Sequence, residues 1–264
     1  MAFEANALPS YVRNTAELMT SRARSADGGV VSTAGYSDPA DGGGDDWVHR
    51  HSGYAALPSA GKGVLYLSSG GDSYKELRDK NRVSIRTAGV NPSATAANNR
   101  AKFQALIDAV QDTEVSSAMH PVVTIPNGVY QIDAPLILDC AKVRDLTFVG
   151  ENFLYAQIRP SNDFVGDALI KLTNTGSGNL QRCIFREFYL RGDKPDGTRI
   201  DFAAKLDAAD HCVFDRMNFS NAAKAGLLVG YSYSNAYVNC WFTGNSQAGF
   251  WADNEVSYNQ SFMY

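Results

Sequence analysis

The amino-acid sequence predicts an all-β protein built as a solenoid, a parallel β-helix. Residues 212–254 contain nearly the same pattern of short apolar strands and Gly, Asn or Ser turns twice. Phe219 and Phe242 are 23 residues apart, and so are Gly226 and Gly249. Coils of this length bury their apolar face only by stacking on one another. The repeat has neither the Leu/Asn frame of a leucine-rich repeat nor a helical period, so strands form each coil.

Further copies of this pattern extend the solenoid in both directions. Leu190 lies 29 residues before Phe219, and the excess falls in the polar run 193–200, which is expected to form a loop at one edge of a coil. Segments 145–150 and 257–262 are interpreted as a fourth and a fifth copy. The sequence stops within that last coil, so we expect the β-helix to be truncated at its C-terminal end.

The composition limits the possible partners. The chain has 264 residues and a net charge of −4, with no cluster of Lys or Arg, so no nucleic-acid partner is predicted. No stretch approaches the ~18 consecutive apolar residues of a membrane span. Glu4 stands where a secretory signal would carry basic residues. We therefore expect neither a membrane span nor Sec-type export.

Cysteine and histidine spacing indicates no metal site. The four cysteines are Cys140, Cys183, Cys212 and Cys240, all in the repeat region and without a CxxC pair. Equivalent positions of adjacent coils stack ~4.8 Å apart, so these cysteines are expected to pack as small buried side chains. His49 and His51 alternate onto one side of a strand, but a third ligand is missing. The sequence predicts no metal and no cofactor.

Two regions are predicted ahead of the β-helix. Residues 1–27 form an N-terminal arm with one short helix, capped by Asn14 or Thr15. The apolar face of that helix is weak, which fits either ordering by a partner or a frayed terminus. Residues 28–86 form a small β-rich adaptor or neck domain.

Short strands and tight turns characterise the adaptor. Strands are expected within 30–36, 47–49 and 63–67. The Gly-rich segment 41–46 is expected to be a hairpin turn, because it lacks both the Walker spacing and the tandem copies of a calcium-binding repeat. Residues 74–80 are interpreted as a charged turn or short helix leading to the domain boundary.

Residues 87–264 are predicted to be the β-helix, with one amphipathic helix at about 97–112. Apolar residues recur at helical spacing at Ala101, Phe103, Leu106, Ile107 and Val110, between the polar residues Asn98, Asn99, Arg100, Lys102 and Gln104. The first coil of a solenoid exposes an open strand edge and an apolar end. We therefore expect this helix to cap the β-helix.

The start of this region resembles a known family. The helix 99–109, the strand pattern 123–132 and the segment 146–151 are similar to the N-terminal portion of the pectate-lyase-like right-handed parallel β-helices found in phage tailspikes. Upstream, residues 31–44 are similar to a Gly-Tyr, Pro, Asp-Gly-Gly-Gly element that often precedes such β-helices. The sequence departs from the family at 89–99, where an acidic, Gly-rich loop is usual.

The resemblance implies a homotrimer whose N-terminal region attaches to tail or baseplate proteins of a virion. It implies a β-helix that binds and depolymerises a host surface polysaccharide, and so a location in the virion tail and action at the host cell surface. It transfers no catalytic residue, because function resides in sites that differ between members of one fold.

Candidate catalytic residues follow from the needs of glycoside hydrolysis. That reaction uses two carboxylates, which a β-helix can supply from stacked coils or from positions i and i+2 of one strand. Asp253 and Glu255 form the best local pair, and Asp210 and Asp215 also fall on the repeats. A solvated turn after the strand is the favoured explanation of Asp253 and Glu255. A lyase would instead need Arg or Lys and His as charge and proton partners.

Exposed aromatic residues are candidates for stacking on sugar rings. Tyr231, Tyr233, Trp241 and Trp251 lie in or beside the repeats. Strand alternation lets only one of Phe250 and Trp251 face inward, so one of them is expected on the surface.

Three functions follow from the sequence. The first is a phage tailspike or tail-fibre protein that binds and depolymerises host polysaccharide. The second is a non-catalytic structural or adhesin subunit of the tail, which the weakness of the carboxylate pairs favours. The third is a free bacterial polysaccharide lyase, against which the absence of an export signal and the N-terminal arm both count.

Overall fold

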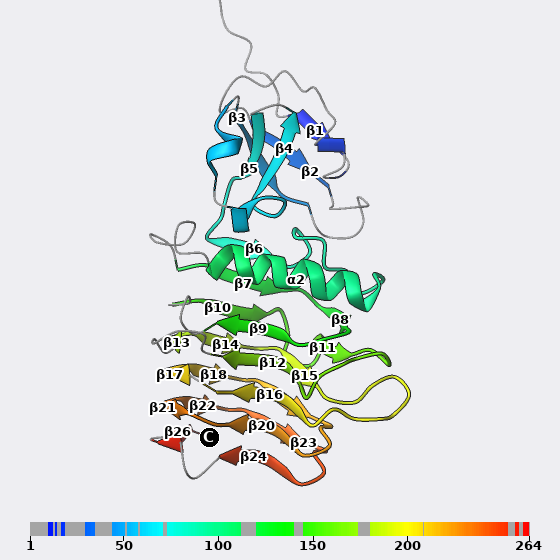
Figure 1. The fold of residues 1–264 in the computed structure, drawn as a ribbon, viewed down its shortest axis with the longest axis vertical. Coiled ribbons are helices and arrows are strands. Elements are labelled where there is room, and N and C mark those ends of the chain that lie inside the picture. The colour runs from blue at the N-terminus through cyan, green and yellow to red at the C-terminus, as the bar shows by residue number, and fades with distance from the viewer. Residues whose placement is uncertain are drawn as a thin grey trace, which may run out of the picture.

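The structure is a computed structural model, and most of the chain from residue 30 onward is described by it (Figure 1). The described residues are 10–12, 14, 17–18, 30–34, 44–50, 52–57, 59–70, 73–111, 120–139, 145–173, 180–207, 209–252, 257–258 and 261–263. Within them a small mixed sheet, called sheet A, lies at one end of a stack of parallel coils, with one α-helix between the two (Figure 1).

Sheet A has the strand order β1-β2-β3-β5-β4. Its strands are β1 (Ser10–Val12), β2 (Val30–Thr33), β3 (Asp46–Arg50), β4 (Tyr66–Gly70) and β5 (Ser73–Leu77), and two short 3-10 helices are η1 (Tyr54–Ala56) and η2 (Ser59–Gly61). Val31, Trp47 and Leu77 are completely buried in its core. The backbone N–H of Glu17 donates to Asn14 Oδ1 at 2.8 Å, which identifies Asn14 as the helix cap. The turn residues 35–43 lie outside the described residues.

The interpretation of residues 74–80 as a turn or short helix is wrong. Most of this segment belongs to β5, which pairs with both β3 and β4. The carboxylate of Glu76 is paired with two cations. Arg50 Nε on the neighbouring strand β3 lies 3.1 Å from Glu76 Oε2, and Lys80 of the same segment forms an ion pair with this carboxylate. Sequence alone does not show these partners, so a run of charged residues predicts a turn or short helix here.

The β-helix consists of four parallel sheets, called B to E, through which the chain passes once per coil. Sheet B contains β6 (Arg82–Ser84), β7 (Val122–Ile125), β10 (Thr147–Gly150), β14 (Ile184–Arg186), β18 (Val213–Asp215), β22 (Ala236–Val238) and β26 (Ser261–Met263). Sheet C contains β8 (Gly128–Ile132), β11 (Ala156–Pro160), β15 (Tyr189–Arg191), β19 (Asn218–Ser220) and β23 (Trp241–Thr243). Sheet D contains β9 (Leu136–Asp139), β12 (Ala168–Thr173), β16 (Phe202–Leu206), β20 (Ala225–Val229) and β24 (Ala248–Ala252). Sheet E contains β13 (Leu180–Gln181), β17 (Ala209–Asp210), β21 (Ser232–Tyr233) and β25 (Ser257–Tyr258).

The register of these sheets confirms the predicted repeat. Leu190 pairs with Phe219, and Phe219 pairs with Phe242, at the offsets of 29 and 23 residues seen in the sequence. The excess residues 193–200 form a loop closed by a bridge between Asp193 and Arg199. The division of the chain at residues 27 and 86 stays a prediction, and β6 already pairs with β7 in sheet B.

Aromatic rings stack through the interior on the sheet B side. Successive coils contribute Phe148, Phe185, Phe214, Tyr237 and Phe262, with centroids 4.9 to 5.5 Å apart. Cys183 and Cys212 are fully buried free thiols, as predicted, whereas Cys140 lies outside the described residues. Cys240 is also free, and burial raises the pKa of its thiol to about 11.

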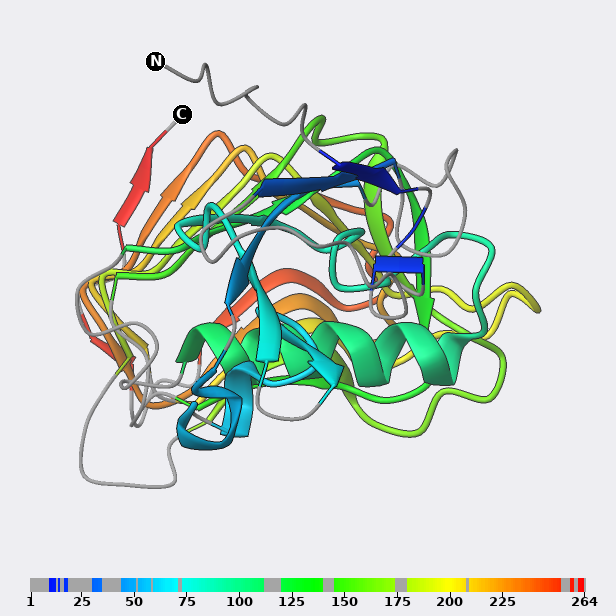
Figure 2. The same ribbon diagram turned by 90° about the horizontal axis from the view of Figure 1, so that it is seen from above.

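The helix α2 (Ala96–Gln111) confirms the predicted cap. Seen from above, it lies across the end of the coil stack (Figure 2). Phe103, Leu106 and Ile107 are buried against the first coil, and the Phe103 ring lies 6.5 Å from that of Phe148. The helix therefore covers the apolar end of the solenoid.

Polar side chains of α2 also satisfy the open strand edge. Gln104 accepts from Ile137 N at 2.8 Å and donates to Ile137 O at 2.9 Å, so it binds β9 as a neighbouring strand would. Gln111 accepts from Asp139 N at 2.8 Å, and Asn99 donates to Gln131 O at 3.2 Å. Asn99 is completely buried, so it and Gln104 do not lie on a purely solvent-facing side of the helix.

Candidate functional site

The aromatic candidates lie on three different sheets. Trp241 begins β23 in sheet C and is 51% exposed, whereas Trp251 belongs to β24 in sheet D and is 44% exposed. Phe250 packs inward against Tyr237, so the predicted alternation at residues 250 and 251 is correct. Tyr231 and Tyr233 lie together at sheet E, with their rings edge to face at 5.2 Å. The structure therefore does not assemble the four candidates into one site.

The candidate carboxylates are also separated. Asp215 in sheet B lies 3.0 Å from Arg186 Nε and 3.6 Å from Arg216 Nε, a network that fits a structural charge. Asp210 ends β17 in sheet E, directly before His211, which turns the corner with a positive φ of 54°. Asp253 and Glu255 lie outside the described residues. These four assignments stay predictions.

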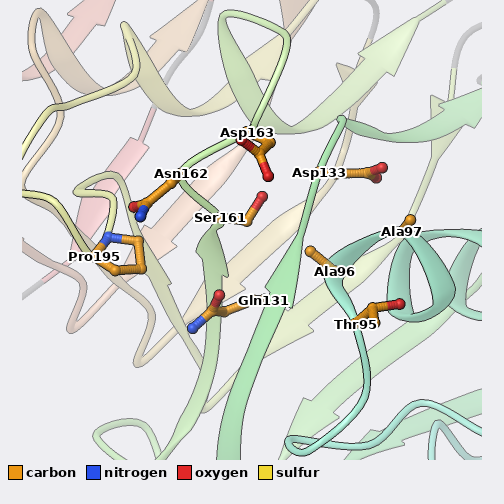
Figure 3. A pocket seen from close by; sticks show the side chains of 9 residues that line it. All are labelled: Thr95, Ala96, Ala97, Gln131, Asp133, Ser161, Asn162, Asp163 and Pro195. Atoms are coloured by element: carbon orange, nitrogen blue, oxygen red, sulfur yellow. The ribbon is translucent and has the colours of Figure 1, made fainter.

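A polar pocket of about 380 Å³ lies where β8 and β11 end in sheet C (Figure 3). Its lining residues are Thr95, Ala96, Ala97, Gln131, Asp133, Ser161, Asn162, Asp163 and Pro195. They come from the start of α2, from two successive coils and from the 193–200 loop. The pocket is therefore built by four segments that are distant in the sequence.

Two carboxylates reach this pocket from neighbouring coils. Asp133 directly follows β8, and Asp163 follows β11 by three residues. The register pairs Ile132 with Pro160, so the two turns lie one above the other. Ser161 N donates to Ile132 O at 2.9 Å, which holds the turns together. This is the stacked-coil arrangement by which a β-helix can supply a carboxylate pair.

The N-terminus of α2 forms another wall. Thr95 caps the helix, since its Oγ1 accepts from Asn98 N at 3.3 Å. Arg100, one turn further along, places Nε 3.6 Å from Asp133 Oδ1. The helix end and this guanidinium both favour negative charge and hydrogen-bond acceptors in the pocket.

Two polar atoms in the pocket are buried without a hydrogen bond to any residue that the structure describes. They are Asp133 Oδ1 and the hydroxyl oxygen of Ser161, a residue only 7% exposed. Figure 3 shows the Ser161 hydroxyl and the Asp163 carboxylate directed toward each other. Asp133 Oδ1 is partly compensated by Arg100, whose Nε lies 3.6 Å away. Leaving the Ser161 hydroxyl unsatisfied costs about 1 to 3 kcal/mol, so a hydroxyl-bearing ligand would be stabilised here.

The 193–200 loop lines the pocket through Pro195, and hydrogen bonds attach the loop to Asn162. Asp196 N donates to Asn162 Oδ1 at 3.0 Å, and Lys194 Nζ donates to Asn162 O at 3.2 Å. At the base of the loop, Asp193 accepts hydrogen bonds from Arg159 and Arg191 at 2.7 to 3.0 Å. The loop therefore holds Pro195 at the pocket edge.

The charge of Asp193 is stabilised in this network. Burial alone would raise the pKa of its carboxyl group. The hydrogen bonds from Arg191 and Asn221 and the positive charges of Arg191 and Arg159 outweigh burial and hold that pKa below its usual range.

Sequence reasoning missed Asp133 and Asp163 because neither lies in the 23-residue repeat. The available signals were the turn-forming runs after apolar strands, Asp133-Ala134-Pro135 and Ser161-Asn162-Asp163. These two turns lie side by side only if Ile132 pairs with Pro160, at an offset of 28 residues. No pair of similar residues at this offset reveals that pairing in the sequence.

Comparison with known proteins places this architecture in a family. Residues 83–263 match the model of the family described as rhamnogalacturonase A/epimerase, pectate lyase-like. The chain belongs to this pectate lyase-like family. The family match starts at β6 and covers the coils that carry the pocket. Among curated proteins, none matches this pectate lyase-like chain.

Solved tailspikes have similar structures at low sequence identity. Tailspike protein 2 from Escherichia coli O157:H7 bacteriophage CAB120 gives a TM-score of 0.71 at 10% identity, over 96% of this chain and 32% of that one. Tailspike protein gp49 from Acinetobacter baumannii bacteriophage Fri1, a capsular polysaccharide depolymerase, gives 0.64 at 13% identity, over 88% and 46%. The gp42 tailspike of Acinetobacter phage vb_AbaP_AS12 gives 0.64 at 15% identity, over 92% and 46%. These likenesses establish the fold, and the pectate lyase-like chain spans less than half the length of each.

The described residues of this pectate lyase-like chain contain neither a candidate membrane helix nor a candidate metal cluster. None of the helices found there is long and apolar enough to cross a membrane. In the same residues no three His, Cys, Asp or Glu side chains are grouped so that they could hold a metal ion.

Proposed function

We propose that this chain belongs to a tailspike-type protein whose β-helix binds and depolymerises a bacterial surface polysaccharide. The observation that carries the proposal is that Asp133 and Asp163, from two successive coils, both line one polar pocket. A sugar polymer offers hydroxyl groups for Asp133 Oδ1 and Ser161, and a glycosidic bond between two carboxyl groups is the arrangement that glycoside hydrolysis needs.

The two carboxyl groups differ in their surroundings, and we assign their roles from that difference. Asp133 is partly buried and forms an ion pair with Arg100, so it acts as the carboxylate that attacks or that activates water. Asp163 is exposed, at the open side of the pocket, and protonates the leaving oxygen. Gln131 and Asn162 supply amide groups that orient the sugar.

The proposal includes the wider assembly that the resemblance implies. The protein is a homotrimer, its N-terminal region attaches to tail or baseplate proteins of a virion, and it acts at the host cell surface. Support comes from the tailspike likeness, which extends over 96% of the chain and so includes both sheet A and the coils. Sedimentation of the protein at a monomeric mass would count against this part.

Depolymerisation of a panel of bacterial surface polysaccharides tests the central claim. The full-length protein that contains this chain is incubated with each polymer, and polymer size is followed together with the ultraviolet absorbance of unsaturated sugar products. Asp133→Asn and Asp163→Asn are each expected to slow chain shortening about 100-fold or more. Asp210→Asn and Asp215→Asn test the two described candidates from the repeats, and Asp201→Asn, at a carboxylate paired with Lys224, is the control expected to retain activity.

Each result has a distinct meaning. Chain shortening with new absorbance would identify a lyase instead of a hydrolase. Binding without shortening would favour the non-catalytic adhesin. Full activity in both Asp133→Asn and Asp163→Asn would refute the assignment of the pocket as the active site. Loss of activity in Asp210→Asn would place the active site at sheet E, and loss in Asp215→Asn would place it at sheet B.

A further inference from the structure

Sheet C carries a second polar and aromatic feature, away from the pocket. One outward-facing position of successive coils is occupied by Val129, Gln157, Tyr189, Asn218 and Trp241, which we call the outer ladder. The residues that follow them in the strands face the interior, where the first four are buried and Phe242 is partly buried. The outer ladder therefore runs along the stack, with apolar residues at its ends and polar residues between them.

Two side-chain amides of the outer ladder have a carbonyl oxygen that accepts no hydrogen bond from the described residues. Asn218 is 4% exposed, and its Oδ1 makes no hydrogen bond within the described part of the chain. Gln157 Oε1 is buried in the same way. Tyr189 stands between them and uses its hydroxyl group in a hydrogen bond with Ser220. Two such oxygens on one ladder are unusual in a folded chain and indicate a place for hydrogen-bond donors from outside.

Trp241 provides an aromatic surface at one end of the outer ladder. Its indole is 51% exposed and meets the Phe153 ring edge to face at 5.0 Å. Phe153 precedes β11, which lies three strands from β23, or about 14 Å at the usual strand spacing. The segment 151–155 therefore reaches along the ladder across the intervening coils.

The tight start of this segment supports that path. A Cβ atom on Gly150 would lie 2.1 Å from the backbone oxygen of Glu187, so the chain leaves β10 pressed against the next coil. Leu154 and Tyr155 are 38% and 63% exposed on the same segment. Aromatic and apolar surface thus borders the unsatisfied amides.

The charges nearby favour an uncharged ligand. The outer ladder itself carries no carboxylate, Lys, Arg or His side chain. Arg159 and Arg191 occupy the next outward positions on their strands, and both are engaged by Asp193. A ligand that donates hydroxyl hydrogens to amides and stacks an apolar face on an indole is a neutral sugar, whereas a uronate would find no free cation on the described ladder.

We propose that the outer ladder is a binding subsite for neutral sugar units of the polysaccharide. The sugar ring stacks on Trp241 in place of Phe153, and its hydroxyl groups donate to Asn218 Oδ1 and Gln157 Oε1. This inference rests on the proposed function for the identity of the polymer. It concerns a different part of sheet C, because the ladder lies near the strand starts and the Asp133–Asp163 pocket lies beyond the strand ends.

The test measures binding of the full-length protein to an array of bacterial oligosaccharides with neutral and uronate-containing members. Trp241→Ala and Asn218→Leu are each expected to weaken binding to neutral members about tenfold. Asn218→Leu also removes a buried unsatisfied oxygen, so its unfolding midpoint is expected to be equal to or above that of the wild type. Met263→Ala is the control, an exposed apolar side chain on sheet B (52% exposed), and is expected to bind normally.

The outcomes separate this inference from the proposed function. If the wild type binds and Trp241→Ala and Asn218→Leu bind equally well, the subsite is wrong while polysaccharide recognition stands. Binding confined to uronate-containing members would overturn the neutral-sugar assignment, and a fall in oligomeric mass in Trp241→Ala would instead mark a subunit interface. Loss of binding in Trp241→Ala but retained binding in the inactive Asp163→Asn supports two distinct sites. A wild type that binds no member overturns both proposals.

Discussion

Replacing Phe214 by leucine tests whether the stacked rings stabilise the coils beyond ordinary burial. Phe214 lies at the centre of the stack, with its centroid 4.9 Å from that of Phe185 and 5.2 Å from that of Tyr237. The interplanar angles are 6° and 13°, so the rings are nearly parallel. Leucine retains most of the buried apolar volume but loses both stacked contacts, together with a tilted contact to the Phe219 ring at 6.2 Å.

The expected loss is the sum of two effects. A volume-conserving apolar exchange in a core costs less than about 1.5 kcal/mol. Each aromatic pair contributes about 0.5 to 1.5 kcal/mol beyond its buried area, so two pairs add about 1 to 3 kcal/mol. Phe214→Leu should therefore lower the free energy of unfolding by about 1 to 3 kcal/mol more than the exchange alone.

Phe188→Leu supplies that comparison. Phe188 is also completely buried in an adjacent coil, but its ring has no aromatic partner among the described residues. Urea unfolding of the two variants, with the slope of the transition unchanged, gives the difference in free energy. A double-mutant cycle of Phe214→Leu with Phe185→Leu should show coupling of about 0.5 to 1.5 kcal/mol.

Equal losses in Phe214→Leu and Phe188→Leu, within the usual additivity error of about 0.5 kcal/mol, would refute the reasoning. The aromatic stack would then be a consequence of coil stacking, with no separate contribution. A changed slope in Phe214→Leu alone would mean that the coils no longer unfold as one unit, and the comparison would have to be made from coil to coil.

Two further predictions concern the segments around sheet C. Gly150→Ala should lower the free energy of unfolding by about 3 kcal/mol, because its Cβ would lie 2.1 Å from Glu187 O. Gly197→Ala, at an open loop position with φ of +87°, should cost about 1 kcal/mol, and equal losses in urea unfolding would contradict the close approach at Gly150. Asp193→Asn should cost about 2 kcal/mol at neutral pH, since the charge-assisted hydrogen bonds from Arg191 weaken. The pKa of Asp193 is lowered in the folded state, so its stabilisation is present above the unfolded pKa and is lost as pH falls through the folded value. The difference between wild type and variant should shrink in acid, and a difference that stays constant from neutral pH into acid would argue against this ion pair.

The coil register was predictable because it depends on inward-facing residues. Phe219 and Phe242 must occupy the same interior position, so their spacing appears directly in the sequence. The same alternation predicted that one of Phe250 and Trp251 faces outward, and the structure shows that it is Trp251. The α2 helix was predictable from its apolar spacing. The hydrogen bonds of Gln104 with the edge of β9 were not, because the backbone groups of a strand edge can bind any polar side chain and so leave no mark in the sequence.

The pocket could not be predicted by the same reasoning. Asp133 and Asp163 lie in turns, where coil length varies and no interior packing fixes the residue type. Their proximity depends on two coils of unequal length and on the 193–200 loop, which Asp193 anchors from a third coil. Such a site is visible only after the coils are stacked.

The same physical distinction explains why sheet C can carry both proposed sites. Interior positions such as Ile158 and Leu190 are completely or almost completely buried, so packing restricts them to apolar residues. Outward positions and strand ends are free of that restriction, and there the chain holds Gln157, Asn218 and Asp133, each with a buried oxygen that lacks a hydrogen bond to the described residues. Residues that lower the stability of the folded chain and contribute nothing to the core are best explained by a ligand that completes their hydrogen bonds.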